Sequence, residues 1–356
     1  MANTKSEINF DKVLQFQKVF EESLLDIATR TPEEERCIIL SGGVDTCAIL
    51  EAAKKLGVIF QAGFTVVTND QSHDKGYSEA AAKKHNLKHF LINLTPEQLI
   101  ETHLSPCVNL LGTFCGMTLR NSLVVAAALR KASEEGYKHA IVGDGADELF
   151  GGYSFMWSQE GDEWKEKRDS MCAKWTFATQ KLANSFGLTS HSPYTESRTV
   201  KWAITNTLKD DCIGTRPIQL KYGGEFLDHL TGKLILRYAY ETVSSWRRKE
   251  PIEVGSGATV IGYDSFWADL ISDEEFKSET ETLLKRGYII QSKENLNNFR
   301  IFEKAFNLNG GIENGTHPKI RLPIGEGCIG CCFEIGDAMF CHICGAYPAQ
   351  RTQANA

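Results

Sequence analysis

Two short stretches of the chain place glycines beside acidic side chains. The first reads SGGVDT, at residues 41–46, and the second reads GDGADELFGGY, at residues 143–153. Glycine has no Cβ, so main-chain N–H groups can approach an oxyanion closely, and the start of a helix adds the positive end of its dipole. Carboxylates repel a bare phosphate and therefore require a cation beside such a loop. The two stretches together predict a phosphate-binding site that contains a metal ion.

In the first stretch, Gly42 and Gly43 would clear the backbone of side chains. The hydroxyls of Ser41 and Thr46 would donate hydrogen bonds to phosphate oxygens. Asp45 would hold a magnesium ion that also binds the phosphates, since hard oxygen ligands suit this ion. The stretch matches neither GxxxxGK followed by serine or threonine nor GxGxxG. Taken alone, a tight strand-to-helix turn with a solvated aspartate would explain the same residues.

The second stretch carries three acidic residues, Asp144, Asp147 and Glu148, directly after another apolar run. A plain turn needs no such cluster, and carboxylates this close disfavour one another unless a cation compensates. We expect both stretches at the same edge of a sheet, where Asp147 would complete the metal site that Asp45 begins. The alternative is a solvated acidic turn followed by a glycine-rich helix start.

The elements that must position these residues follow from the hydrophobic pattern. Apolar runs predict strands at residues 37–40, 59–67, 89–93 and 139–142. Helical spacing predicts helices at residues 10–28, 46–56, 74–85, 96–103 and 117–134. Strands that alternate with helices indicate an α/β fold, in which right-handed crossovers build a parallel sheet with helices on both faces. Ligands of such sheets bind at the carboxyl ends of the strands, where both glycine-bearing stretches fall.

The strand rhythm stops after Tyr153, and helix formers and tryptophans follow. We therefore expect a helical region after the sheet and a small cysteine-rich module near the end of the chain. The expected parts are an N-terminal helix in residues 1–34, an ATP-binding α/β domain in 35–153, a mostly helical substrate-side region in 154–320, the cysteine-rich module in 321–348 and a flexible tail in 349–356.

These motifs carry a family resemblance. SGGVDT resembles the SGGxDS pyrophosphate loop (PP-loop) of N-type ATP pyrophosphatases, and with GDGADELFGGY the chain resembles the synthetase domain of asparagine synthetases and of β-lactam synthetase. Two later stretches agree: PYTESRTVKWAI at residues 193–204, and GKLILRYAYETVSSWRRKEPIEVGSG at residues 232–257, which contains an (R)xKxxxxxGxG element. The resemblance runs from about residue 35 to about residue 260 and implies the PP-loop ATP pyrophosphatase fold.

The resemblance implies a reaction and a set of binding residues. Family members activate a carboxylate by attack on the α-phosphate of ATP, which gives an acyl-adenylate and pyrophosphate. An amine then displaces AMP and forms an amide. The implied ATP-binding residues are Leu40, Ser41, Gly42, Gly43, Asp45, Thr46, Val66 and Gly143, of which Leu40, Val66 and Gly143 would make main-chain contacts with the adenosine. Asp45 and Asp147 would hold magnesium.

Two catalytic residues are implied in the same way. Lys249 matches the late lysine of the family and would neutralise charge that grows on the α-phosphate. Asp144 stands where asparagine synthetases carry a glutamate and β-lactam synthetase a tyrosine, and it would act as a general base toward the amine. The alternatives are a solvated base for Lys249 and a helix-cap or supporting role for Asp144.

The chain departs from asparagine synthetases in two ways. Those enzymes begin with a glutamine-hydrolysing domain whose nucleophile is the cysteine after the initiator methionine, whereas Ala2 follows Met1 here. We therefore expect nitrogen to arrive as free ammonia, as an amine of a second substrate, from within the same substrate, or from a separate glutaminase subunit. Asp144 is also one methylene shorter than the glutamate it replaces, so aspartate does not follow as the substrate.

The segment GEGCIGCCFEIGDAMFCHICGAYP contains two C-x2-C pairs separated by nine residues. Four thiolates at this spacing suit a tetrahedral zinc ion. They are Cys328, Cys331, Cys341 and Cys344, and Cys332 or His342 could replace one of them. The alternatives are an iron–sulfur cluster and a cysteine-bearing strand pair without metal.

Composition excludes some classes of protein. The net charge of −7 argues against an extended nucleic-acid-binding surface, and no apolar run reaches the ~18 residues of a membrane span. The start MANTKSEINF lacks the layout of a secretory signal, and eleven cysteines without such a signal indicate a reducing compartment. We expect a cytoplasmic enzyme whose partners are small molecules, with the oligomeric state open and a homodimer as one option.

An ATP-dependent amide-forming ligase is the leading interpretation, and two alternatives remain at this point. One is a PP-loop enzyme that modifies tRNA or a nucleobase, in which a cysteine-rich tail would hold zinc or a cluster. The other is a non-catalytic ATP-binding protein that partners a glutaminase. The joint presence of Asp45, Asp147 and Lys249 favours retained chemistry.

Overall fold

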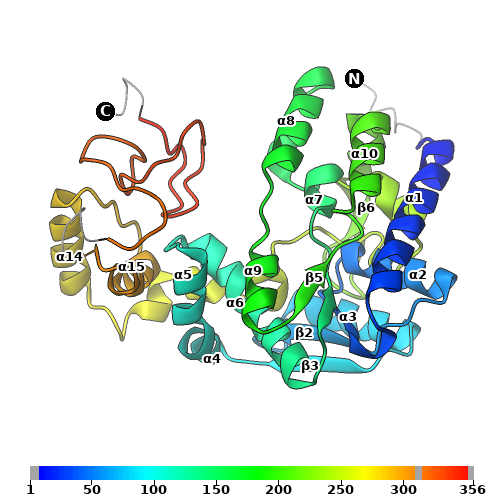
Figure 1. Ribbon diagram of the computed structural model, residues 1–356, viewed down its shortest axis with the longest axis horizontal. Helices are drawn as coiled ribbons and strands as arrows, with labels where there is room; N and C mark the ends of the chain where they lie inside the picture. The colour runs from blue at the N-terminus through cyan, green and yellow to red at the C-terminus, as the bar shows by residue number, and fades with distance from the viewer. Residues whose placement is uncertain (1–7, 309–314, 352–356) are drawn as a thin grey trace. The chain divides into compact units, whose positions relative to one another are not determined.

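The structure is a computed structural model that describes residues 8–308 and 315–351 (Figure 1). It divides into two compact units. Unit 1 comprises Met1–Asn93 and Ala128–Ser256, and unit 2 comprises Leu94–Ala127 and Gly257–Ala356. Each unit is built from two separate stretches, whereas the expected boundaries follow the chain in order. The beginning of the expected N-terminal part and the end of the expected tail, residues 1–7 and 352–356, lie outside the described residues.

The sheet of unit 1 has five strands, all parallel, in the order β3-β2-β1-β4-β5. The strands are β1 (Arg36–Ile39), β2 (Ala62–Val67), β3 (His89–Asn93), β4 (His139–Ile141) and β5 (Thr189–His191). The first four are the strands that the apolar runs predicted, with ends that coincide or differ by at most three residues. The predicted parallel α/β sheet is confirmed.

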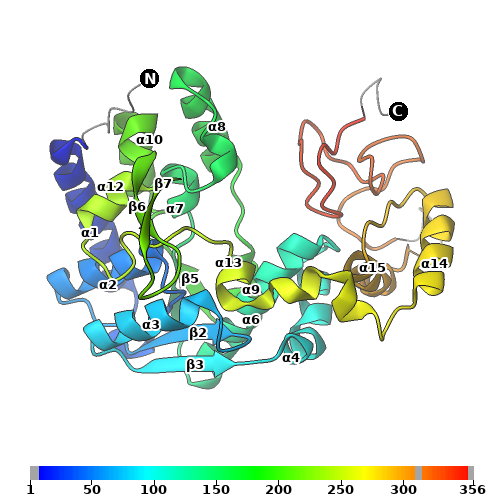
Figure 2. The same cartoon turned by 180° about the vertical axis from the view of Figure 1, so that it is seen from behind.

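Helices cover both faces of this sheet, as predicted. The connecting helices are α2 (Val44–Leu56), α3 (His73–Lys84), α6 (Gly116–Glu134) and α9 (Ala178–Ser185). Right-handed crossovers place α2 and α3 on one face, and they place α6 and α9 on the other because the chain returns across the sheet between β3 and β4. Figure 1 shows α9 over one face, and Figure 2, from behind, shows α3 over the opposite face.

A long helix, α1 (Phe10–Arg30), precedes the first strand of unit 1. Asn9 caps its start, because the Asn9 side chain accepts a hydrogen bond from the main-chain N–H of Lys12. Its apolar stripe, which includes Phe16, Phe20 and Leu24, is fully buried. The stripe packs against α2, α10 (Ser197–Asn206) and α12 (Leu234–Ala239).

The region after Tyr153 contains the expected helices and, in addition, strands. Strand β5 extends the sheet by pairing with β4, and β6 (Gly214–Gln219) and β7 (Phe226–Thr231) form an antiparallel hairpin. Strand β5 reads TSH, which has no apolar alternation, so its strand character comes from pairing with β4 rather than from its own pattern. Further helices of this region in unit 1 are α8 (Gly161–Lys174), α11 (Lys209–Cys212) and α13 (Ile252–Ser256), whereas α7 (Ala146–Leu149) comes just before Tyr153.

Unit 2 is helical apart from its cysteine-rich end. It contains α4 (Pro96–Leu99), a π-helical turn (Ile100–Leu104), α5 (Ser105–Leu111), the first part of α6, α14 (Asp273–Lys285) and α15 (Lys293–Ala305). Thr95 caps α4, because its side chain accepts a hydrogen bond from the N–H of Gln98 in a capping box. The described residues also contain four short 3₁₀ helices. Two lie in unit 1, Glu33–Glu35 and Ser154–Met156, and two lie in unit 2, Ala258–Gly262 and Asp264–Trp267.

Among the described residues, no single helix is both long and apolar enough to cross a bilayer. One pair of helical stretches, Pro96–Leu111 and Gly116–Glu134, reaches that length and apolar character only when taken together, across a bend of 117°.

Candidate active site and metal centre

The strand order of unit 1 reverses next to β1. Strands β2 and β3 lie on one side of β1, and β4 and β5 lie on the other. At such a switch point the loops that follow the two central strands diverge to opposite faces and leave a crevice at the carboxyl end of the sheet. The loop after β1 is SGGVDT, and the loop after β4 is GDGADELFGGY. The fold therefore brings together the two stretches that the sequence singled out.

The loop after β1 is built closely around its glycines. Gly42 has φ +68°, and a Cβ there would lie 2.5 Å from the main-chain nitrogen of Ser78 in α3. Gly43 is the N-cap of α2, so the first N–H groups of this helix face the loop. Gly43 N–H donates to Ser41 Oγ at 3.2 Å, and Thr46 Oγ1 donates to Gly43 O at 3.4 Å. The loop and the helix start together offer main-chain donors suited to an anion.

The loops after β1 and β4 touch each other. A Cβ on Gly143 would lie 2.9 Å from Cβ of Asp45, so only glycine permits this approach. The main-chain oxygen of Asp45 also accepts a hydrogen bond from the hydroxyl of Tyr194 at 2.8 Å. Leu40 and Val66, expected to contact adenosine, are buried at the carboxyl ends of β1 and β2. Their contact with nucleotide stays a prediction.

A lysine that the sequence analysis did not single out lies between the two predicted metal ligands. Nζ of Lys233 lies 2.8 and 2.7 Å from the two carboxylate oxygens of Asp45 and 2.8 Å from Oδ1 of Asp147. The side chain of Lys233 is 1% exposed. Nζ of Lys249 lies 3.2 Å from Oδ2 of Asp147, and its side chain is 27% exposed. The structure thus brings Asp45, Asp147 and Lys249 together around Lys233.

The electrostatics keep Asp147 ionised. Burial would raise the pKa of Asp147, but the ammonium groups of Lys233 and Lys249 outweigh it and hold the pKa below its usual range. Burial would lower the pKa of Lys233, but Asp147 and Asp45 raise it above its ordinary value. Two carboxylates that share one cation are also close enough to share a divalent ion, and carboxylate oxygens are ligands that magnesium prefers. The residues present therefore fit a magnesium ion.

Glycines also make room for Lys233. A Cβ on Gly232 would lie 2.0 Å from the main-chain oxygen of Gly151, and one on Gly152 would lie 1.8 Å from Oδ1 of Asp147. The N–H of Lys233 donates to the main-chain oxygen of Phe150 at 2.8 Å. The sequence held a signal for this residue, because a lysine inside the apolar run GKLIL needs a buried partner.

Asp144 lies in the same loop with a different environment. Burial raises its pKa to about 7, a hydrogen bond from Thr179 opposes the shift, and the charges of Glu148 and Asp147 add to it. Its main-chain oxygen accepts from Ser192 Oγ at 2.6 Å. A carboxyl group that titrates near neutrality suits general-base work, although its catalytic role stays a prediction.

The four predicted zinc ligands form one cluster in unit 2. The sulfur atoms of Cys328, Cys331, Cys341 and Cys344 all lie within 4.8 Å of one another. Cys328 Sγ lies 3.5 Å from Cys344 Sγ, and Cys331 Sγ lies 3.7 Å from Cys341 Sγ. Four sulfurs bound tetrahedrally at about 2.3 Å would lie about 3.8 Å apart. The cluster can therefore hold one metal ion.

The two alternative ligands stand outside this cluster. Cys332 Sγ donates to the main-chain oxygen of Gly287 at 3.4 Å, and Nη2 of Arg351 lies 3.8 Å from the same sulfur. The main-chain oxygen of His342 accepts a hydrogen bond from Thr113 Oγ1 at 2.7 Å. None of the eleven cysteines, all of which fall within the described residues, forms a disulfide.

Comparison with known proteins gives one family. The sequence model described as Asparagine synthase matches residues 24–209, slightly more than half of the 356 residues. A putative glutamine-hydrolyzing asparagine synthetase 1 from Methanocaldococcus jannaschii is 30% identical over 157 residues, which make up 42% of this chain and 28% of that relative. The match thus covers less than a third of the relative's length.

Two solved structures show a distant likeness. One is described as a predicted subunit of tRNA methyltransferase from Methanocaldococcus jannaschii, with 16% identity, a TM-score of 0.28, and coverage of 57% of this chain and 85% of that one. The other is the NMN synthetase of Francisella tularensis, with 15% identity, a TM-score of 0.28, and coverage of 58% and 97%.

Proposed function

The chain belongs to the asparagine synthase family, and we propose that it is an ATP-dependent synthetase that forms an amide and releases AMP and pyrophosphate. The observation that carries the proposal is the group of two carboxylates and two ammonium groups, formed by Asp45, Asp147, Lys233 and Lys249, beside a glycine-cleared loop at the sheet's switch point. Such a group can bind a triphosphate with its metal ion and neutralise the charge that develops when the chain of phosphates breaks.

In the first half-reaction, a substrate carboxylate oxygen attacks the α-phosphorus of ATP and the bond to the β-phosphate oxygen breaks. The N–H groups at Gly42, Gly43 and the start of α2 would hold the leaving pyrophosphate. Lys249, already directed at Asp147, would neutralise the growing charge at the α-phosphate. Asp45 and Asp147 would hold magnesium, which supplies further neutralisation of phosphate charge when it is bound.

In the second half-reaction, a nitrogen attacks the acyl carbon and AMP leaves. Asp144 would take the proton that the nitrogen loses, because its raised pKa makes it a competent base near neutral pH. Ammonia or an amine is the proposed nitrogen source, and a separate glutaminase subunit could supply the ammonia.

For the four-cysteine cluster we propose one structural zinc ion. A single ion requires sulfurs close to ~3.8 Å apart, as found, whereas an iron–sulfur cluster distributes the four thiolates over two or four irons and so spreads the sulfurs farther. All four positions are cysteines, which leaves no open coordination position for substrate and indicates a structural site.

A product assay tests the proposal. The purified protein is incubated with ATP, magnesium, ammonium and a panel of carboxylic acids, and released pyrophosphate and the adenine nucleotide are measured. We expect pyrophosphate and AMP in equal amounts with one class of acid, with the amide identified by mass spectrometry. Formation of ADP, or no nucleotide cleavage with any acid, would contradict the proposal. Asp45→Asn should remove magnesium-dependent turnover, since it weakens one of the two carboxylate ligands.

A further inference from the structure

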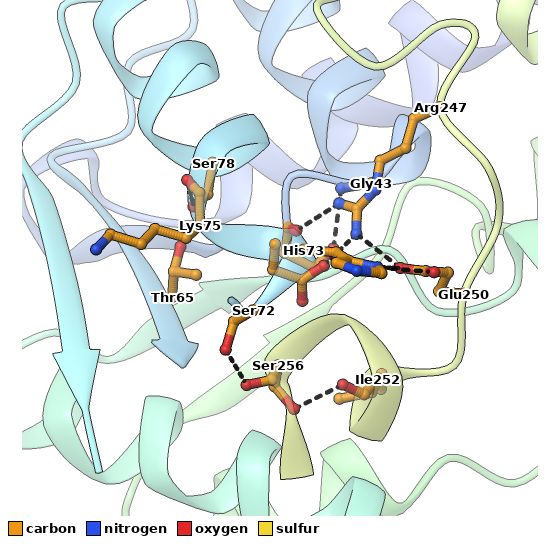
Figure 3. A network of polar contacts seen from close by, with 12 residues as sticks. Gly43, Thr65, Ser72, His73, Lys75, Ser78, Arg247, Glu250, Ile252 and Ser256 are labelled. Carbon is orange, nitrogen blue, oxygen red and sulfur yellow. Dashed lines mark hydrogen bonds and ion pairs between the residues drawn. The ribbon is translucent and has the colours of Figure 1, made fainter. Parts of the chain in front are cut away.

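The segment that carries Lys249 is fixed to the start of α3 by a buried network of polar contacts (Figure 3). Arg247 precedes Lys249 by two residues, and Glu250 follows it directly. Both reach α3, where they meet Asp74 and His73 respectively. The role proposed above for Lys249 makes no use of these contacts.

Arg247 contacts two other parts of unit 1, the phosphate loop and helix α3, with one guanidinium group. Its Nη1 donates to the main-chain oxygen of Ser41, in the phosphate loop, at 3.1 Å. Its Nη2 donates to the carboxylate of Asp74. The guanidinium also lies 4.5 Å from the ring centre of Tyr77, and its side chain is only 5% exposed. The same group thus holds the phosphate loop, helix α3 and the segment of Lys249.

The remainder of the segment is held by further contacts. Nδ1 of His73 lies 2.8 Å from Oε2 of Glu250. The main-chain oxygen of Ser256 accepts hydrogen bonds from Ser72 Oγ at 2.6 Å and from Thr68 N at 2.9 Å. A Cβ on Gly255 would lie 2.3 Å from Oδ1 of Asp74, so a glycine at this position leaves space for the carboxylate that binds Arg247. The contacts bracket Lys249 on both sides.

We propose that Arg247 is a positioning residue that sets Lys249 against the phosphate loop by linking Ser41 to Asp74. Lys249 lies two residues from Arg247 along the chain, so a displacement of the anchor moves its ammonium group relative to Asp147 and to the phosphate that the loop holds. This inference rests on the proposed function of Lys249, and it adds a residue that would touch neither nucleotide nor substrate.

The chemistry of the contacts requires an arginine. A planar guanidinium presents several N–H donors in fixed directions and can bind a carbonyl oxygen and a carboxylate at the same time while it stacks on an aromatic ring. A lysine keeps the charge but has one nitrogen at the end of a flexible stem, so it would retain the ion pair with Asp74 and lose the fixed link to Ser41. Arg247→Lys therefore keeps the positive charge at this position and removes the fixed link that would position Lys249.

The sequence offers a matched control, because Arg248 is the exposed neighbour of Arg247. Pyrophosphate exchange into ATP is measured for Arg247→Lys and Arg248→Lys across ATP concentrations. We expect kcat to fall about 100-fold in Arg247→Lys, with the KM for ATP changed by less than about threefold, since a displacement near 1 Å can cost this much in rate. Arg248→Lys should match the parent protein. Equal kinetics in the two variants would overturn the proposal, as would a loss confined to KM.

A second measurement needs no turnover. The rate of reductive methylation of Lys249 is followed by mass spectrometry in the parent protein and in both variants, at matched folded fractions. We expect Lys249 to react several-fold faster in Arg247→Lys, because its ammonium group is no longer held at Asp147, and unchanged in Arg248→Lys. An unchanged rate in Arg247→Lys would overturn the positioning role.

A protein that labels as expected but cleaves no ATP would contradict the proposed function alone, so the two failures are distinguishable. If Arg247→Lys does not fold, Gly255→Ala serves as the second variant, since its Cβ would displace Asp74 without removing a charge. It should show the same rise in methylation of Lys249, and an unchanged rate would again count against the proposal.

Discussion

At the scale of single residues, the centre of the site is a balance of charge. Lys233 is almost completely buried and forms ion pairs with two carboxylates at once. A buried charge without a partner is costly, so each of these groups depends on the others. A metal cation that binds Asp45 and Asp147 would compensate part of the negative charge that Lys233 compensates in its absence. Stability and metal binding at this site should therefore be linked.

The first prediction concerns that link. Lys233→Met leaves Asp45 and Asp147 facing each other without their shared cation, and we expect a loss of about 3 kcal/mol in the free energy of unfolding in metal-free buffer. Millimolar magnesium should restore part of it. Urea unfolding with and without magnesium measures both effects. Lys249→Met is the matched control, because it removes the more exposed partner of Asp147 and leaves Lys233 in place. Equal losses in the two variants would contradict the assignment.

The second prediction concerns Asp144, whose pKa in the folded protein is about 7 against an ordinary value of 3.8. The folded state therefore holds the proton more tightly than the unfolded state. The stabilisation that this gives is complete below the ordinary pKa and is lost as the pH rises toward the folded pKa. We expect Asp144→Asn to become progressively more stable relative to the parent protein as the pH rises from about 4 to about 8.

We expect amide formation by the parent protein to rise through about pH 7, and the same substitution should remove this rise, since the base is gone. Urea unfolding and product formation across this pH range measure the two effects. Asp162→Asn, at an aspartate on α8 whose side chain is 90% exposed, is the control and should leave both profiles unchanged. A stability difference for Asp144→Asn that does not vary with pH would contradict the raised pKa.

At the scale of elements, the site depends on how closely helices and loops approach through glycines. Gly42 and Gly57 flank helix α2 and have nearly the same backbone conformation, with φ values of +68° and +69°. A Cβ at Gly57 meets nothing within 4 Å, whereas one at Gly42 collides with α3. An alanine at Gly57 would therefore cause backbone strain alone, whereas an alanine at Gly42 would cause the same strain and a collision with α3.

The third prediction uses this pair. Gly57→Ala should lower the free energy of unfolding by about 1–2 kcal/mol, the cost of a left-handed alanine, and should leave ATP binding intact. Gly42→Ala should cost at least as much and should also abolish magnesium–ATP binding, because the phosphate loop must move away from Ser78. Calorimetric titration with ATP and thermal unfolding provide the measurements. ATP binding by Gly42→Ala at the strength of Gly57→Ala would show that the loop is not the phosphate site.

At the scale of the whole molecule, the cysteine cluster is the part of the chain whose structure a metal ion would hold together. The described residues 321–351 form no helix or regular strand, and only an isolated bridge joins Arg321 to Phe333. A segment with so little regular structure gains much of its stability from a metal ion that crosslinks it.

The fourth prediction follows. Metal analysis of the purified protein should find about one zinc ion per chain, as one four-sulfur group implies. Cys341→Ser should lose the metal and lower the melting temperature, whereas Cys332→Ser should retain it, because that sulfur stands outside the group. A metal-free protein that melts at the same temperature as the zinc-loaded one would contradict a structural zinc site. Iron with visible absorption would indicate a cluster in its place.

The sequence by itself determined the parallel sheet and which loops meet at its edge. Hydrophobic periodicity predicted β1 to β4 to within a few residues, since buried parallel strands read as apolar runs. The glycine and acid spacing predicted that the loops of Asp45 and Asp147 meet, and the structure brings them together around one lysine. The cysteine spacing also predicted the four-sulfur group, because the four cysteines lie within a short stretch of chain.

Only the tertiary structure decided the rest. Strand β5 has no pattern of its own and exists through its pairing with β4. Lys233 lies 188 residues from Asp45 along the chain, and Arg247 lies 206 residues from Ser41, and such distant contacts leave no local periodicity. Their burial is tolerated because each finds fixed partners in the folded state, and the choice of those partners depends on the packing of distant elements rather than on neighbouring residues.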